Sequence, residues 1–333
     1  MVSPCSGGCL LCVSTKTVHD LCCLSLYEWK QALLELVFRV RVKTSGDRYT
    51  LEGPCVIILN HRTRFDWLFA WCYMLRFGNL TKHKIILKSA LKRIPIFGWA
   101  TQAAQFMFLS RDWSNDEKYM TDSLSYFTSQ YYPIQLLLFP EGTDLSESNK
   151  SKGHKFAEEH GLQKYNYVLH PRTKGFVHCV QALRQGGRPV PVYNMTIGYV
   201  GAIPQNETDI ATGRWPDEIH FDCTYIPSSE LPLEESELEG WLKACWQQKE
   251  EKLKAFYANG HFNTPYFEEG SSSRARLSML VTLIFWAAFH IAIFYCLYLF
   301  SMLRWYCLGA TLLFVILTQF TNGLETIVLR IYK

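Results

Sequence analysis

The sequence predicts an α/β domain, with a central sheet flanked by helices, followed by a C-terminal transmembrane helical hairpin. Short apolar runs alternate with amphipathic stretches between about residues 51 and 257, which is the pattern of strands and helices packed in layers. Residues 277–302 contain no Asp, Glu, Lys or Arg, and a second apolar run follows at residues 305–320. A chain of 333 residues suits one large domain with appended segments.

Buried strands are predicted where apolar residues run without interruption. Cys55–Leu59 is such a run and is ended by polar residues, as expected of a strand covered on both faces. Further strands are predicted at residues 103–109, 135–139, 190–199 and 218–226. Pro140 ends the third of these five strands, because proline cannot donate to a sheet.

Amphipathic or charged stretches between the predicted strands indicate helices that cover the sheet. They are expected at residues 65–77, 117–132, 147–160 and 234–256. The second stops before Pro133, since the residue preceding a proline disfavours helical dihedral angles. The third is polar and ends at Gly161, a residue type common at helix ends.

The apolar C-terminal segment predicts a membrane hairpin. Residues 277–302 exceed the roughly 20 residues that a helix needs to cross a bilayer core. Basic residues flank the two runs on both sides: Arg274, Arg276, Arg330 and Lys333. This favours a hairpin with both ends in the cytosol; one span plus an interfacial segment is the alternative. His290 is expected to face a neighbouring helix rather than to carry protons.

Composition argues against nucleic-acid binding. The net charge is +4, and no dense Lys/Arg stripe is present. The 12 cysteines form no regular framework, which predicts reduced thiols in the cytosol. Cys5, Cys9 and Cys12 are not followed by a second pair at zinc-finger spacing, and the H-E-x-x-H motif is missing. No metal site is predicted.

The candidate catalytic pair is His61 and Asp66, after the first predicted strand. On a regular helix they would differ by about 140° in direction, so they meet only if His61 lies in the turn before a helix and Asp66 in its first turns. Asp66 would then fix the imidazole tautomer and stabilise the imidazolium that forms when the other nitrogen takes a proton. Alone, this spacing is common by chance and would predict a surface His and a helix-capping Asp.

Two further polar groups follow predicted strands. Glu141, Gly142 and Thr143 come directly after the third strand. Gly142 would let the backbone approach a ligand closely, and Glu141 would either hold the loop or bind substrate hydroxyls. Arg111 lies just beyond the second strand, where a guanidinium suits a phosphate. Ligands of open α/β sheets collect beyond strand ends, so we expect these groups to converge with His61.

Four other basic residues lie near the motifs. Arg62 and Arg64 flank the candidate base, and they would either bind CoA or lipid phosphates or simply be solvated. Lys88 and Lys92 are expected on a solvated helix face.

Together the motifs resemble the four boxes of the glycerolipid acyltransferases, the 1-acylglycerol-3-phosphate acyltransferase family. The matching residues, in the family's order, are His61 with Asp66, then 108–111, 139–143 and Pro191. The longer stretches NHRTRFDW, LLLFPEGTD and YVLHPRTKGF are similar to the lysocardiolipin acyltransferase branch. The resemblance runs from about residue 33 to the hairpin.

This resemblance implies a glycerolipid acyltransferase-like fold with a mixed central sheet. It also implies transfer of an acyl chain from acyl-CoA, as co-substrate and with no bound cofactor, to a free hydroxyl of an anionic lysophospholipid in phospholipid remodelling. Lysocardiolipin, lysophosphatidylinositol and lysophosphatidylglycerol are the expected acceptors. His61 would be the general base, and Asp66 would orient it. The substrate-binding residues would be Arg111, Glu141, Gly142, Thr143 and Arg64.

Three alternatives stay open. The acceptor would be 1-acylglycerol-3-phosphate in phosphatidic acid synthesis, or water in a thioesterase, or the chain would be an inactive membrane scaffold. Intact motif residues argue against the scaffold, and the missing G-x-S-x-G motif argues against a serine hydrolase.

The resemblance and the hairpin imply an integral membrane protein of the endoplasmic reticulum whose catalytic domain faces the cytosol. Its expected partners are membrane lipids, and its oligomeric state is not predicted. Relatives in this branch usually begin with a hydrophobic anchor, whereas residues 1–24 are Cys-rich and too polar to span. The expected parts are a Cys-rich segment (1–24), an amphipathic or membrane-surface segment (25–50), the catalytic domain (51–260), a linker (261–276), the membrane hairpin (277–325) and a cytosolic tail (326–333).

Overall fold

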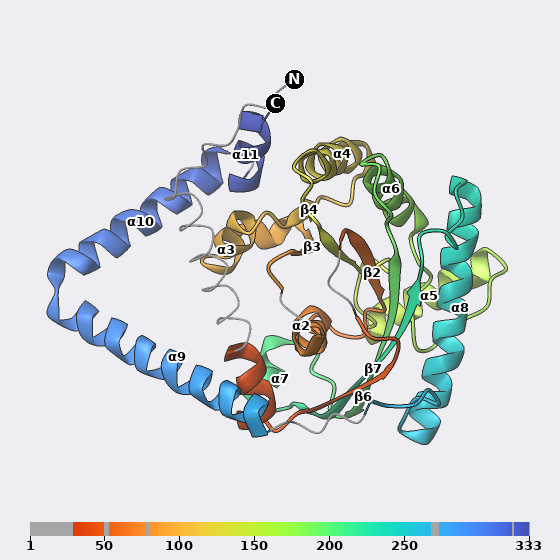
Figure 1. Ribbon diagram of the computed structural model, residues 1–333, viewed down its shortest axis with the longest axis horizontal. Helices are drawn as coiled ribbons and strands as arrows, with labels where there is room; N and C mark the ends of the chain where they lie inside the picture. The colour runs from red at the N-terminus through yellow and green to blue at the C-terminus, as the bar shows by residue number, and fades with distance from the viewer. Residues whose placement is uncertain (1–28, 50–52, 78–79, 268–272, 322, 333) are drawn as a thin grey trace.

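The computed structural model describes residues 29–49, 53–77, 80–267, 273–321 and 323–332. The expectations for the Cys-rich segment, including its cysteine cluster, lie outside the described residues. The described part forms a layered α/β domain, from which two long helices protrude on one side (Figure 1).

A seven-stranded mixed sheet forms the centre of the domain, in the order β1-β7-β6-β2-β5-β3-β4. Only the β6–β7 pair is antiparallel; the other neighbours pair in parallel. The strands are β1 (Arg41–Gly46), β2 (Cys55–Leu59), β3 (His83–Lys88), β4 (Met107–Leu109), β5 (Gln135–Leu138), β6 (Val192–Gly201) and β7 (Pro216–Ile226). The predicted α/β class with a mixed sheet is confirmed.

Alternation along β2 explains why its run of five apolar residues is buried on both faces. Val56 and Ile58 pack into one hydrophobic cluster with residues of α4, α6 and α8. Ile57 and Leu59 point to the opposite face and pack with residues of α2. The two clusters pack tightly on the two faces of the central strands. The ends of β2 and β5, from which the next turns begin, are therefore held in fixed positions.

Four of the five predicted strands are confirmed, but the one at residues 103–109 is largely wrong. Ala103 ends helix α3 (Phe97–Ala103), and only Met107–Leu109 forms a strand. Gln105, between them, has a φ of 57° and turns the chain. β1 and β3 were not expected as strands. The sequence of β3 is interrupted by Lys84, which folds back to donate to the Ala104 carbonyl.

The predicted helices are all present, with shifted ends. They are α2 (Asp66–Phe77), α4 (Trp113–Ser129), α5 (Glu147–Glu159) and α8 (Glu235–Asn259). The helix expected to carry Lys88 and Lys92 is the short 3₁₀ helix η2 (Ser89–Arg93), which begins only after Lys88. Helices α3, α6 (Thr173–Arg184) and α7 (Glu207–Ala211) were not expected.

Within residues 25–50, the described part forms a strand–helix unit of the domain. A short helical segment including η1 (Leu33–Val37) leads into β1, which pairs with β7. At the other end of the domain, Tyr266 bridges to Ser45, and Phe267 N donates to the Thr44 carbonyl at 2.9 Å. The start of the expected linker is therefore fastened to the sheet edge.

Two apolar helices, α9 (Ser273–Leu299) and α10 (Ser301–Phe320), follow the domain. Within them, Arg276–Leu299 and Ser301–Thr318 are long and apolar enough to cross a membrane. Almost none of their residues are buried against the rest of the protein. Arg304 donates to the carbonyls of Leu297 and Tyr298, which closes the sharp turn between the helices. The helices diverge from this turn like the arms of a V (Figure 1). His290 stacks on Trp29, at 5.5 Å between ring centroids, as expected for a ring facing another helix.

After the hairpin, the described part of the expected cytosolic tail belongs to a helix that packs against the domain. Helix α11 (Leu324–Tyr332) packs against α3 and α4. Leu324 N donates to Gln102 Oε1 at 2.9 Å, and the buried Glu325 forms an ion pair with Lys92. Lys92 is only 18% exposed, so the expectation of a solvated lysine at this position is wrong.

Candidate active site

The motif residues meet beyond the carboxyl ends of parallel strands. His61 follows β2, Glu141 follows β5 and Arg111 follows β4. Hydrogen bonds join these turns: the His61 carbonyl accepts Leu145 N at 2.8 Å, and the Gly142 carbonyl accepts Arg111 Nη2 at 2.6 Å. The structure thus brings together the three motifs that the sequence placed after separate strands.

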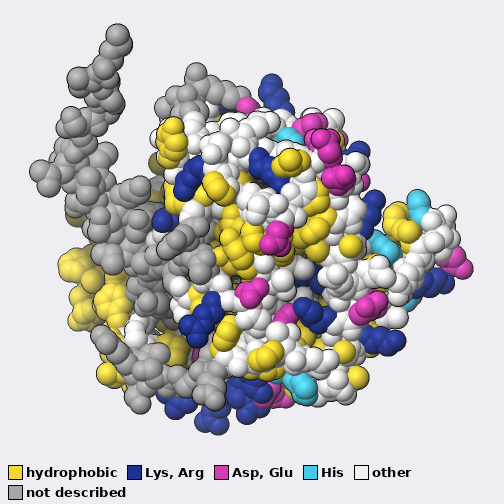
Figure 2. Space-filling view, turned by 45° about the vertical axis from the view of Figure 1, so that its right-hand side comes forward, with side chains coloured by type: hydrophobic (Ala, Val, Ile, Leu, Met, Phe, Trp, Pro, Cys, Tyr) yellow, Lys and Arg dark blue, Asp and Glu magenta, His cyan; other side chains and the backbone are white. Residues whose placement is uncertain are grey.

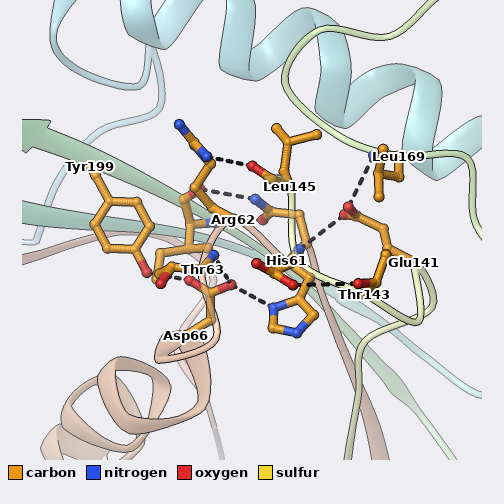
Figure 3. Close-up of polar contacts among 12 residues, drawn as sticks. His61, Arg62, Thr63, Asp66, Glu141, Thr143, Leu145, Leu169 and Tyr199 are labelled. Atoms are coloured by element: carbon orange, nitrogen blue, oxygen red, sulfur yellow. Dashed lines mark hydrogen bonds and ion pairs between the residues drawn. The ribbon is translucent and has the colours of Figure 1, made fainter. Parts of the chain in front are cut away.

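His61 and Asp66 form a hydrogen-bonded pair (Figure 3). His61 lies in the turn after β2, and Asp66 is the first residue of α2, so that Nδ1 and Oδ2 are 2.9 Å apart. Thr63 N donates to the same Oδ2 at 3.0 Å, and the Tyr199 hydroxyl donates to Oδ1. Asp66 is completely buried. The pair therefore has the predicted geometry, with a third member, Tyr199, from β6.

The electrostatics of His61 favour proton uptake. Burial disfavours its charged form, but the hydrogen bond and the negative charge of Asp66, helped by the charges of Glu141 and Asp144, outweigh burial and raise the pKa of His61. Burial and the Asp66 charge raise the pKa of Tyr199, so its phenol stays protonated and can donate. The Nε2 atom of His61 has no hydrogen-bond partner among the described residues, and the ring lines a cavity.

Glu141 faces the protein rather than the cavity. Its carboxylate accepts His61 N at 3.0 Å, Leu169 N at 3.0 Å and Trp246 Nε1 at 3.2 Å. It is 3% exposed, and burial raises its pKa to about 7 against the effect of these donors. Of the two roles considered for Glu141, these contacts fit a residue that holds the loop.

The other two residues of this loop differ in position. Gly142 lines the cavity with a φ of 71°, and a Cβ there would lie 3.4 Å from the Arg172 side chain. Thr143 does not line it; its hydroxyl accepts from Asn149 Nδ2 at 3.0 Å and donates to Asp144. Thr143 thus braces the loop through helix α5.

A cavity of about 550 Å³ opens beside His61, within the usual size of small-molecule sites. Much of its wall is apolar: Trp67, Leu87, Leu91, Phe97, Leu109, Trp113 and Met120. Its basic lining residues are Arg64, Lys88, Arg111, Arg172 and Lys174. One carboxylate, Asp116, also lines it, but it is held by Ser110 N and Arg111 N at 2.8 Å each. The cavity therefore suits a ligand with a hydrocarbon part and an anionic part.

The basic residues come from both expected and unexpected places. Arg64 lines the cavity but also pairs with Glu207 at 3.2 Å, whereas Arg62 is tied to the Leu145 carbonyl at 2.7 Å. Lys88 ends β3 and lines the cavity, so a solvated helix face was the wrong expectation for it.

Three cavity or dyad residues were missed from the sequence. Arg172 and Lys174 stand at the start of α6, and their basic pair next to a helix start was a usable sign of an anion site. Nothing in the sequence pointed to a role for Tyr199, because a tyrosine in a buried strand has the same sequence pattern as a core residue.

A buried carboxylate–histidine pair beside a partly apolar, partly cationic cavity suits acid–base chemistry on a ligand that has both a hydrocarbon and an anionic part. The family described as acyltransferase matches residues 39–198, and the acyltransferase C-terminus family matches residues 209–286. Lysocardiolipin acyltransferase 1 of Mus musculus is 42% identical over 91% of this chain and 82% of its own length. The chain therefore belongs to the acyltransferase family.

Two other proteins extend the comparison. Lysophosphatidylinositol acyltransferase 10 of Caenorhabditis elegans is 41% identical over 68% of this chain and 59% of its own length. The crystal structure of the 1-acyl-sn-glycerophosphate acyltransferase PlsC from Thermotoga maritima aligns with a TM-score of 0.47 and 18% identity, over 70% of this chain and 80% of that chain.

Proposed function

We propose that the protein transfers the acyl chain of acyl-CoA to a free hydroxyl of an anionic lysophospholipid during phospholipid remodelling. The observation that carries this proposal is the His61–Asp66 pair, whose unpartnered Nε2 lies at a cavity with both apolar and cationic walls. Relatives named as lysocardiolipin and lysophosphatidylinositol acyltransferases support the choice of acceptor class.

The geometry fits a single-displacement reaction. Nε2 of His61 removes the proton from the acceptor hydroxyl, and the oxygen attacks the thioester carbonyl. The tetrahedral intermediate expels the CoA thiolate, which takes the proton back from the imidazolium. Asp66 holds the Nδ1 proton, and thereby the tautomer, while Tyr199 orients Asp66. General base catalysis typically supplies about 10²–10⁴-fold, and holding both substrates together supplies much of the rest.

Arg111 and Arg172 are proposed to hold the acceptor phosphate. Both reach Gly142, which lies in the loop next to His61. The phosphate of a lysophospholipid is only a few bonds from its reacting hydroxyl, whereas the CoA phosphates lie at the far end of the pantetheine arm. Cations this close to the base therefore fit the acceptor better than CoA. Lys88 and Lys174 add positive charge to the same cavity, and Arg64 lies at its edge, paired with Glu207.

The first prediction concerns the reaction itself. Membranes containing the wild-type chain should transfer labelled oleate from oleoyl-CoA to lysocardiolipin, lysophosphatidylinositol or lysophosphatidylglycerol, and His61→Ala should lower the rate by about 10³-fold or more. If 1-acylglycerol-3-phosphate were the only lysolipid acylated, the proposed acceptors would be wrong and the protein would act in phosphatidic acid synthesis. CoA release without added lysolipid would indicate a thioesterase, and no product with any acceptor would favour a scaffold.

The second prediction concerns pH. Because His61 must be neutral to accept a proton and its pKa is raised, activity should fall as the pH drops through that raised value. Asp66→Asn removes the charge that raises the pKa, so the acidic limb of kcat/KM should move to lower pH while the plateau falls by about 10²-fold or more. Tyr199→Phe removes the hydrogen bond that the phenol donates to Asp66, so the Asp66 carboxylate should stabilise the imidazolium more strongly. The pKa of His61 should then rise further, and the acidic limb of kcat/KM should move to higher pH. An acidic limb at the same pH in both variants and the wild type would contradict the proposal that Asp66 sets the pKa of a His61 base.

The third prediction concerns the phosphate site. Arg172→Gln removes the charge but keeps the backbone N–H that donates to the Pro140 carbonyl at 2.7 Å. The KM for the lysophospholipid should rise about tenfold, because one charge-assisted contact is lost, with kcat little changed. Arg214→Gln is the matched control, since Arg214 is 72% exposed and outside the cavity. A rise only in the KM for acyl-CoA would reassign Arg172 to the donor.

We also propose that the protein is an integral membrane protein of the endoplasmic reticulum with its catalytic domain in the cytosol. The fourth prediction follows: the glycosylation sequons at Asn79, Asn149, Asn194 and Asn206 should carry no glycan. Asn149 is already bonded to Thr143 Oγ1 and the Asp144 carbonyl at 3.0 Å each, and Asn206 caps α7. A mobility shift on glycosidase treatment of the protein from microsomes would place the domain in the lumen.

A further inference from the structure

The loop between η2 and α3, residues 94–96, presents two large apolar side chains to the outside. Ile94 is 43% exposed and Ile96 is 77% exposed. Ile96 also has a φ of 66°, a conformation that is strained for a β-branched residue. Glycine would remove the strain at this position, so nothing in the local backbone explains an isoleucine there.

The loop lies beside the apolar C-terminal helices. Trp99, three residues after Ile96, stacks on Phe314 of α10, with ring centroids 5.3 Å apart. Phe314 is four residues before Thr318, which ends the apolar segment Ser301–Thr318, so it lies about 6 Å inside that end. Trp99 is therefore at the depth where aromatic residues gather at a membrane interface.

The surrounding charges suit the surface of an anionic membrane. No Asp or Glu occurs between residues 53 and 111 except Asp66. Lys88, just before η2, and Arg93, its last residue, are both exposed. Basic residues around an apolar tip favour contact with anionic headgroups while the tip enters the acyl region. By contrast, side chains of both charge signs are spread over the face of the domain that includes α8, on the side away from the hairpin (Figures 1 and 2).

The loop is also next in sequence to residues that line the cavity beside His61. Leu91, just before the loop, and Phe97, just after it, both line that cavity. A tip that enters lipid would therefore place the apolar cavity wall next to the acyl chains of the bilayer.

We propose that residues 94–96 insert into the lipid surface, and that the lysophospholipid acceptor enters the cavity laterally from the bilayer past this loop. The insertion rests on the loop's own exposure and position, whereas the entry of the acceptor rests on the proposed acyl transfer. The partner is a lipid surface bearing anionic headgroups.

The insertion is tested without using activity. A photoreactive benzoylphenylalanine replaces Ile96 in the full chain, which is reconstituted in vesicles of phosphatidylcholine and phosphatidylserine containing a labelled phospholipid. Leu233, which is 74% exposed and precedes α8, receives the same group as the matched control. Irradiation should attach labelled lipid at position 96 at least tenfold more than at position 233, and equal labelling would overturn the insertion.

The entry of the acceptor is tested by kinetics in the same vesicles. Ile96→Asp and Ile96→Gly should each raise the KM, as surface mole fraction of lysophospholipid, about tenfold with kcat unchanged, and Leu233→Asp should leave both unchanged. Ile96→Gly removes the Cβ that is unfavourable at this positive φ, and both variants are compared at equal amounts of folded, membrane-bound protein, so that a folding defect is distinguished from a change in KM. Wild-type kinetics in both variants would overturn lateral entry. If the wild-type chain transfers no acyl group, the proposed function fails, whereas lipid labelling at position 96 would still support insertion.

Discussion

The buried carboxylate of Glu141 is the interaction on which the arrangement of the site depends. It accepts N–H groups from His61 in the β2 turn, from Leu169 in the loop before α6 and from Trp246 in α8. Burying a carboxylate is costly, as its pKa of about 7 shows, and the three donors offset much of that cost. Without it, these donors would be buried and unpaired, and the turn that carries His61 would lose its fixed position.

Glu250 of α8 holds the neighbouring loop in the same way. It accepts the backbone N–H groups of Asn166, Tyr167 and Val168 at 2.6, 2.8 and 3.1 Å. The loop then continues to Arg172, whose side chain reaches the cavity. Helix α8, a long, charged helix on the outside of the sheet, thus holds the segments that carry His61 and Arg172, and none of its own side chains lines the cavity.

The apolar C-terminal helices are joined to the site through α3, η2 and α11. Phe97 and Leu91 line the cavity, while Gln102 and Lys92 of the same two elements hold α11. A buried ion pair such as Lys92–Glu325 adds little net stability but disfavours alternative packings. The chain that follows the hairpin is therefore fastened to two elements that also form part of the cavity wall.

The sequence by itself determined that His61 and Asp66 form a pair and that two apolar helices follow the domain. His61 and Asp66 meet because one strand, one turn and one helix start suffice to join them, and the hairpin follows from composition alone. The strand expected at residues 103–109 failed because apolar composition does not separate a helix end and a turn from a strand. Only the tertiary structure decided that Tyr199, 133 residues away, supports Asp66, and that Lys92 is buried against α11. Such contacts depend on strand order and helix packing, which bring distant segments together and leave no local pattern.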